Sequence, residues 1–280
     1  MTAPPRLRRT HGEGRVGPFA TFVDRVRPDG VVARWGTRRH RKQPPGATTE
    51  STWWAPAERG WWIGVLFAVG SLLFAVGAIP AYATSVGVRA DSVTFFVGSL
   101  FFTSAGFLTY REAVDAGPPG HDGTRRRFFV YQPHRIDWWS TSVQLVGTLC
   151  FNVSTGYAIV SDLSAHAANR YVWRPDAVGS ICFLIASGLA WFEVCHGWTA
   201  WRPRSWSWWI TGLNLLGSIA FGGSAIAGYI NPATGELRNA ARSNLGTLIG
   251  AICFLAGALM LLPERTAPPR EAADEAGGAT

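Results

Sequence analysis

The chain has 280 residues, 48% of them hydrophobic, and a formal net charge of +8. Its charges gather in residues 1–59, 111–137 and 264–275, and long apolar stretches fill most of the rest. This segregation argues against the one or two soluble domains that the length alone would allow.

The first segment, residues 1–52, is basic, and we predict a mostly disordered cytoplasmic region. Within it, residues 18–26 (PFATFVDRV) are predicted to form a short amphipathic turn against lipid. Four basic residues follow close together: Arg38, Arg39, Arg41 and Lys42. Such a cluster is expected to bind anionic lipid headgroups. Nucleic acid is the alternative ligand, but a basic flank beside a membrane is the commoner arrangement, so we expect no nucleic-acid binding.

Six apolar stretches follow, each near the roughly 20 residues that a helix needs to cross a hydrocarbon core of about 30 Å. They cover residues 62–83, 92–110, 138–159, 177–195, 208–230 and 244–262. Their apolarity is continuous rather than alternating, which favours helices over a membrane barrel. Since backbone groups inside lipid must pair within the segment, the sequence predicts an all-α integral membrane protein with six transmembrane helices.

The basic residues predict the orientation of these helices. Of the 26 Lys and Arg residues, 21 fall in the N-terminal segment, the second and fourth connections and the C-terminal tail. Positive charge concentrates on the cytoplasmic side of membrane proteins. We therefore predict a multi-pass protein of the cell membrane with both termini in the cytoplasm.

One motif, [WY]-x-P-x4-W-W-x7-G, occurs three times, each time entering an odd-numbered apolar stretch. Its tryptophan pairs are Trp61–Trp62, Trp138–Trp139 and Trp208–Trp209. Self-similarity of this kind predicts repeated structural units. The predicted units are two-helix hairpins at residues 53–112, 130–196 and 200–264, followed by a disordered tail at 265–280. The tryptophans are expected to anchor each hairpin at the headgroup layer, where amphipathic rings are enriched.

A second motif, G-[ST]-[LI]-x-F or a close variant, lies within every apolar stretch. Its glycines are Gly70, Gly98, Gly147, Gly179, Gly217 and Gly250. The phenylalanine four residues later and a small residue seven residues later share one helical face with the glycine. Small residues let two helix backbones approach closely inside lipid, so we predict that these glycines pack helix against helix.

Three polar residues within the apolar stretches are candidate binding residues: Gln144, Asn152 and Asn214. Gln144 and Asn214 hold the same position in the repeat, three residues before the glycine. Polar side chains inside a membrane often mark a solute or ion pathway. The alternative is an interhelical hydrogen bond that fixes the packing.

In the second, fourth and sixth apolar stretches a glutamate follows the motif glycine by fourteen residues: Glu112, Glu193 and Glu264. Fourteen helical residues rise about 21 Å, which would put these carboxylates at the cytoplasmic headgroups. We expect them to form ion pairs there with neighbouring arginines: Arg111, Arg135, Arg202 or Arg265.

Catalytic and metal-binding patterns are missing from the sequence. It contains no G-x-S-x-G, H-E-x-x-H, P-loop or C-x-x-C motif. The adjacent Cys195 and His196 are too few for a metal site without further ligands. We therefore expect no enzyme activity, no catalytic residues, no cofactor and no metal.

The paired strings FAVGSLLF (67–74) and FFVGSLFF (95–102), with variants in the other four stretches, resemble the YrhK-like family of small bacterial membrane proteins. The resemblance implies a two-helix membrane unit, here in three tandem copies, and no established activity. The function we predict is a non-enzymatic structural, sensing or scaffold role, with a protein partner or a homo-oligomer left open. The alternative is a small-solute or ion transporter or channel with a polar path lined by Gln144, Asn152 and Asn214.

Overall fold

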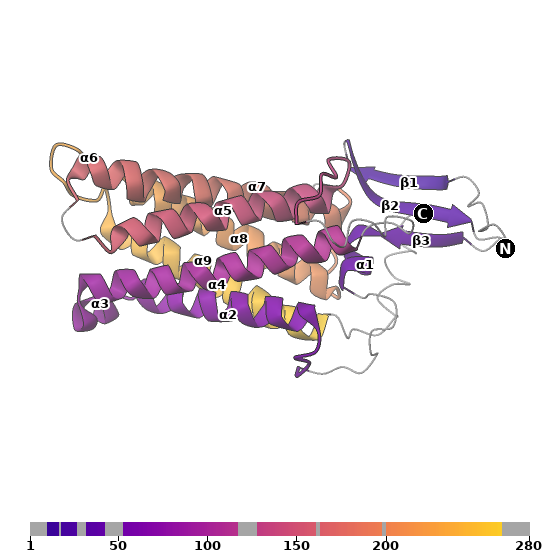
Figure 1. The fold of residues 1–280 in the computed structure, drawn as a ribbon, viewed down its shortest axis with the longest axis horizontal. Coiled ribbons are helices and arrows are strands. Elements are labelled where there is room, and N and C mark those ends of the chain that lie inside the picture. The colour runs from indigo at the N-terminus through magenta and orange to yellow at the C-terminus, as the bar shows by residue number, and fades with distance from the viewer. Residues whose placement is uncertain are drawn as a thin grey trace.

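A computed structural model describes residues 10–16, 18–26, 32–42, 53–116, 128–160, 163–197 and 200–264. From residue 53 onward the elements of the described chain are helices, with isolated bridge positions at Arg135 and between Ile230 and Leu237. Six long helices lie side by side along one direction (Figure 1). They are α2 (Arg59–Gly77), α4 (Val88–Asp115), α5 (Ile136–Ala158), α7 (Arg174–Cys195), α8 (Trp206–Ala227) and α9 (Ala240–Glu264). Three short elements lie between them: α3 (Pro80–Val86), α6 (Ala165–Ala168) and the π-helix η2 (Asn169–Trp173).

Five helical segments are long and apolar enough to cross a membrane: Arg59–Gly77, Val88–Asp115, Ala165–Cys195, Trp206–Ala227 and Ala240–Glu264. Large apolar side chains on these helices point outward, and Leu72, Ile181 and Ile252 are each more than half exposed. Exposed apolar area of this extent fits a lipid environment. The chain is therefore a helical, multi-pass membrane protein.

Helix α5 is not among these five candidate spans. Its 23 residues are enough to cross a membrane, but Asp137, Gln144 and Asn152 and several serines and threonines lower its apolarity. Six membrane helices were predicted, and five of the long helices meet the criteria of length and composition.

The N-terminal segment contains a small antiparallel sheet in the order β1-β2-β3. Its strands are β1 (Thr10–Val16), β2 (Phe19–Val26) and β3 (Val32–Gly36), and helix α1 (Thr37–Lys42) follows directly. The predicted disorder of residues 1–52 is wrong for the described part of that segment. The predicted amphipathic turn at 18–26 is also wrong, because β2 covers most of it. Phe, Thr and Val favour extended backbone when neighbouring strands can pair with them. The all-α description therefore applies to the bundle but not to this segment, and the tail at 265–280 lies outside the described residues.

The six long helices close into a ring. Helices consecutive in the sequence pack against each other from α2 through α4, α5, α7 and α8 to α9, and α9 packs back against α2. The closest partners along the chain form three pairs, α2 with α4, α5 with α7 and α8 with α9. A closed ring leaves a central space, which side chains must fill.

Six phenylalanines, one from each long helix, fill the centre of the ring in two layers. Phe74, Phe151 and Phe221, from the first helix of each pair, have ring centroids 6.1–6.4 Å apart. Phe102, Phe183 and Phe254, from the second helices, have centroids 5.6–6.2 Å apart. All six are buried. These two phenylalanine layers close the axis of the bundle near its middle.

The motif glycines face these rings across each helix pair. A Cβ atom at Gly70 would lie 2.9 Å from the ring of Phe102 and 3.0 Å from the carbonyl oxygen of Gly98. At Gly250 a Cβ atom would lie 2.6 Å from the ring of Phe221. The other four glycines face the phenylalanine of their partner helix in the same way: Gly98, Gly147, Gly179 and Gly217. The backbones are thus close enough that no side chain fits between them.

The three tryptophan pairs make the same contacts. The first indole N–H of each pair donates to a backbone carbonyl eight residues earlier, at 2.6–2.8 Å: Trp61, Trp138 and Trp208. The second donates at 2.9 Å to the carbonyl of the motif proline: Trp62 to Pro56, Trp139 to Pro133 and Trp209 to Pro203. Each pair therefore fastens the incoming chain to the start of its helix. Anchoring in the headgroup layer stays a prediction.

Candidate functional site

Helix α1 lies at one end of the bundle, between the sheet and the ends of the long helices (Figure 1). Its sequence, TRRHRK, places basic residues at positions 38, 41 and 42. Residues three and four apart lie on the same face of a helix. One face of α1 therefore carries Arg38, Arg41 and Lys42.

Each of these three cations pairs with one of the glutamates at the ends of α4, α7 and α9. The pairs, with their N–O distances, are Lys42–Glu112 at 2.9 Å, Arg41–Glu193 at 3.2 Å and Arg38–Glu264 at 2.7 Å. The glutamates are only 8%, 3% and 6% exposed. One buried carboxylate from each helix pair thus holds α1, and the partners are 70, 152 and 226 residues apart in the sequence.

In the ion pairs described above the glutamates bind cations of α1, whereas the predicted partners were Arg111, Arg135, Arg202 or Arg265. Arg111 pairs with Asp115 at 2.9 Å, one turn further along α4. It precedes Glu112 directly, and adjacent residues on a helix point in different directions. Arg135 pairs with Asp137. Arg265 lies outside the described residues.

Arg41 is the centre of the ion-pair cluster. Besides Glu193, its guanidinium lies 3.6 Å from Asp137 and 3.9 Å from Glu112, and the residue is 7% exposed. Burial lowers the pKa of the Arg41 guanidinium, but the surrounding carboxylates of Glu193, Asp137 and Glu112 outweigh burial and raise the pKa above its ordinary value. Arg41 therefore stays charged, and three carboxylates share it.

Asp137 and Arg135 extend the cluster. Arg135 was expected to pair with a glutamate rather than with Asp137, and no role was predicted for Asp137. Arg135 donates from Nε to Asp137 Oδ1 at 3.0 Å, from Nη1 to Gln132 at 2.7 Å and from Nη2 to the Ala113 carbonyl at 2.9 Å. Both ionic groups are essentially fully buried. A signal was present in the sequence: Asp137 directly precedes the middle tryptophan pair, where Gly60 and Ser207 stand in the other two copies.

Two hydroxyl groups add further contacts to two of the carboxylates. Thr37, the first residue of α1, donates to Glu193 Oε1 at 2.5 Å. Ser207 at the start of α8 donates to Glu264 Oε1 at 2.6 Å. The bond from Thr37 satisfies the Glu193 oxygen that Arg41 leaves open, as a buried charge requires. At Glu264, Ser207 and Arg38 share Oε1, and Oε2 has no hydrogen-bond partner among the described residues.

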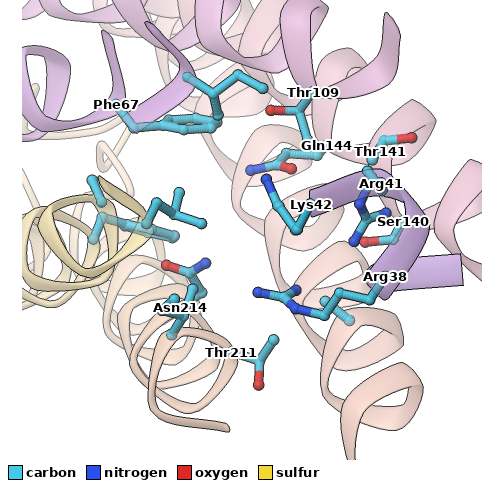
Figure 2. Close-up of a pocket in the computed structure, with 16 residues that line it drawn as sticks. Arg38, Arg41, Lys42, Phe67, Thr109, Ser140, Thr141, Gln144, Thr211 and Asn214 are labelled. Atoms are coloured by element: carbon cyan, nitrogen blue, oxygen red, sulfur yellow. The ribbon is translucent and has the colours of Figure 1, made fainter. Parts of the chain in front are cut away.

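A cavity of about 80 Å³ lies behind the cations, between α1 and the phenylalanine layers. Arg38, Arg41 and Lys42 line one side, as Figure 2 shows, and Phe254 of the layers lines another. Gln144 and Asn214 project into it from α5 and α8 (Figure 2). The cavity is therefore polar near α1 and apolar where the phenylalanines close the axis.

The structure divides the three predicted binding residues. It brings Gln144 and Asn214 together in this cavity. Asn152 is not among the residues that line it, and within the described part of the chain its buried Oδ1 has no hydrogen-bond partner. Eight residues of helix separate Gln144 from Asn152, a rise of about 12 Å, so the two side chains lie at different depths. Two of the three predicted residues therefore share a cavity, and a binding role for Gln144, Asn152 and Asn214 stays a prediction.

The described residues contain no set of side chains that could serve as metal ligands. No group of three or more His, Cys, Asp or Glu side chains there is arranged to hold a metal ion. The carboxylates of the cluster each contact their own nitrogen atoms instead.

No protein-family model, no curated protein and no solved structure matches this chain. What the fold and the site define is a class: a helical multi-pass membrane protein whose N-terminal basic helix is bound by buried carboxylates of its own bundle.

Proposed function

We propose that the protein is a non-enzymatic membrane scaffold whose helix bundle holds the N-terminal sheet and α1 at its cytoplasmic end. One observation carries this proposal: a buried glutamate from each of α4, α7 and α9 binds a different cation of α1. Strand β3 ends at Gly36 and α1 begins at Thr37, so fixing α1 also fixes the sheet. The sheet is then presented to a protein partner in the cytoplasm.

The proposal includes three statements about the membrane. Helix α5 is the sixth span, because its length and its contacts with α4 and α7 match those of the other long helices. The three helix pairs are YrhK-like units, supported by the tryptophan and glycine contacts that recur in each pair. Both termini are cytoplasmic, supported by the 21 basic residues assigned to that side.

The energetics favour the glutamates over lipid as the partner of α1. Anionic headgroups attract a basic residue by about 1 kcal/mol, or about 4 kcal/mol for the four basic residues at positions 38–42. Removing one partner from a buried ion pair costs about 3–5 kcal/mol, because the other charge stays uncompensated. Release of α1 would leave several carboxylates in that state. The lipid surface alone is therefore too weak to draw α1 away.

The scaffold role is tested by neutralising the three glutamates together, as Glu112→Gln, Glu193→Gln and Glu264→Gln. In the full chain in nanodiscs, we expect the backbone amides of residues 37–42 to exchange hydrogen at least about tenfold faster, because local opening then costs less. Glu236→Gln, at an exposed position in the connection between α8 and α9, is the control and should leave the exchange of residues 37–42 unchanged. Unchanged exchange of residues 37–42 in the triple variant would contradict the proposal.

A small-solute transporter or channel is the second candidate, favoured by the cavity that Gln144 and Asn214 share. The phenylalanine layers argue against it, because they close the axis beyond the cavity. Solute and ion flux in proteoliposomes separates the two candidates: the scaffold predicts none. If flux is found and Gln144→Leu with Asn214→Leu leaves it untouched, the polar path is wrong as well.

A further inference from the structure

The ion-pair cluster is balanced only while α1 is in place. Four acidic residues belong to the bundle: Glu112, Asp137, Glu193 and Glu264. In the ion pairs of the described residues, the bundle itself supplies Arg135 to this set. The other three cations come from α1. Without α1, these four buried carboxylates would lose three of the cations that the described ion pairs give them. We call these four acidic residues and the cavity behind them the acidic vestibule.

The vestibule has room for more than the side chains that now occupy it. Arg38, Arg41 and Lys42 line the cavity of about 80 Å³, whereas the four acidic residues are not among the residues that line it. A ligand that replaced them would gain their volume as well as the cavity. Gln144 and Asn214 on the cavity wall carry amide oxygens that accept hydrogen bonds from an amine.

Two observations define the chemistry of such a ligand. No group of three or more carboxylates among the described residues is arranged to hold a metal ion, so a single metal ion would not satisfy them. The groups that satisfy them now are separate nitrogen cations, an ammonium and two guanidinium groups on one helical turn. In addition, the Nε and Nη1 donors of Arg41 are buried without a hydrogen-bond partner, so α1 fits the vestibule incompletely.

We propose that the acidic vestibule binds a small organic polycation of the linear polyamine class in exchange for α1. This inference rests on the proposed function, since exchange frees the sheet that the scaffold holds. A polyamine places ammonium groups several bonds apart on a flexible chain, which suits carboxylates spread over three helix pairs. Unlike the lipid surface, the polyamine enters the acidic vestibule. There it compensates the negative charge of the carboxylates that lose α1 as their partner. Binding of the polycation thereby controls whether the N-terminal sheet is fixed or free.

The first test measures the position of the sheet in the full chain. Spin labels are placed at Pro18→Cys in the β1–β2 turn and at Phe129→Cys, which is 83% exposed, after the four native cysteines are changed to alanine. Spermine, titrated in nanodiscs, is expected to produce a longer and broader distance distribution with saturation. Sodium chloride of equal ionic strength is the control and should not. Identical distributions with and without spermine would overturn the proposal, and equal effects of spermine and salt would reduce it to charge screening.

The second test measures binding of radiolabelled spermine directly. Arg38→Gln, Arg41→Gln and Lys42→Gln together remove the competing cations, so spermine should bind at least about tenfold more tightly than to the wild type. Adding Glu112→Gln, Glu193→Gln and Glu264→Gln to that variant should abolish the gain. Equal affinity in all three proteins would overturn the proposal. If the α1 variant does not fold, the label distances of the first test decide alone.

The two proposals fail in different ways. If spermine has no effect but the glutamate variants free residues 37–42, the scaffold stands and the polycation site is wrong. If the glutamate variants leave residues 37–42 protected, the scaffold itself is wrong.

Discussion

The phenylalanine layers and the ion-pair cluster both take residues from all three helix pairs, yet they are built differently. The layers are close to threefold: the same residue type from equivalent helices meets at similar distances. The cluster is not, because α1 is a single helix and offers each glutamate a different partner. The repetitive bundle is therefore asymmetric at the end that α1 contacts, because α1 lies outside the repeat and pairs differently with each helix pair.

The difference also sets how each region responds to mutation. Apolar contacts in the layers are many and individually weak, so losing a few atoms costs a graded amount. Charges in the cluster are few and buried, so losing one leaves another uncompensated. We therefore expect the cluster to be the more sensitive of the two.

The largest effect is expected for Arg41→Met. Three carboxylates lie within 4 Å of the Arg41 guanidinium, and removing it leaves them without their shared cation. We expect the free energy of unfolding to fall by about 3–5 kcal/mol. Denaturant titration of the purified protein in detergent measures this loss. The matched control is Arg59→Met, which breaks the half-exposed pair with Asp115 and should cost about 1 kcal/mol or less. Equal losses would contradict the central role of Arg41.

Gly250→Ala tests the close approach of helices in the bundle. The added Cβ would lie 2.6 Å from the ring of Phe221, so the ring or a backbone must move. We expect a loss of about 1–3 kcal/mol in the same titration. At Gly188 on α7 nothing lies within 4 Å of the added atom, and Gly188→Ala should leave stability unchanged or raise it by up to about 1 kcal/mol. The packing interpretation fails if the two substitutions have the same sign and size.

Phe183→Leu is expected to have the smallest effect of the three. Leucine keeps most of the buried apolar volume, and such exchanges usually cost less than about 1.5 kcal/mol. Phe128→Leu, at a largely exposed ring, is the control and should have almost no effect. A loss as large as that of Arg41→Met would mean that the layers, rather than the cluster, are the sensitive part of the bundle.

Local patterns in the sequence predicted much of the bundle. Continuous apolarity indicated the long helices, and the spacing of Gly70 and Phe74 indicated which faces pack, because both signals lie within one or two helical turns. Gln144 and Asn214 hold the same position in the repeat, which indicated similar surroundings for the two side chains. Both line one cavity. Asn152 has no counterpart at its repeat position, and the structure places it elsewhere.

The ion-pair cluster was beyond such reasoning. A basic run such as residues 38–42 binds phosphates and carboxylates alike, and its carboxylate partners lie 70 to 226 residues away in the sequence. The sheet was missed for a related reason. Its many arginines suggested disorder, whereas strand pairing depends on residues that are distant from one another.

The contact between α1 and the bundle is tested most directly by a double-mutant cycle on Arg38 and Glu264, the pair most distant in sequence. The free energy of unfolding is measured for the wild type, Arg38→Gln, Glu264→Gln and the double variant. If the two side chains pair as described, the double variant loses less than the sum of the single variants, with a coupling of about 1–3 kcal/mol. Strict additivity would contradict the docking of α1 on the bundle.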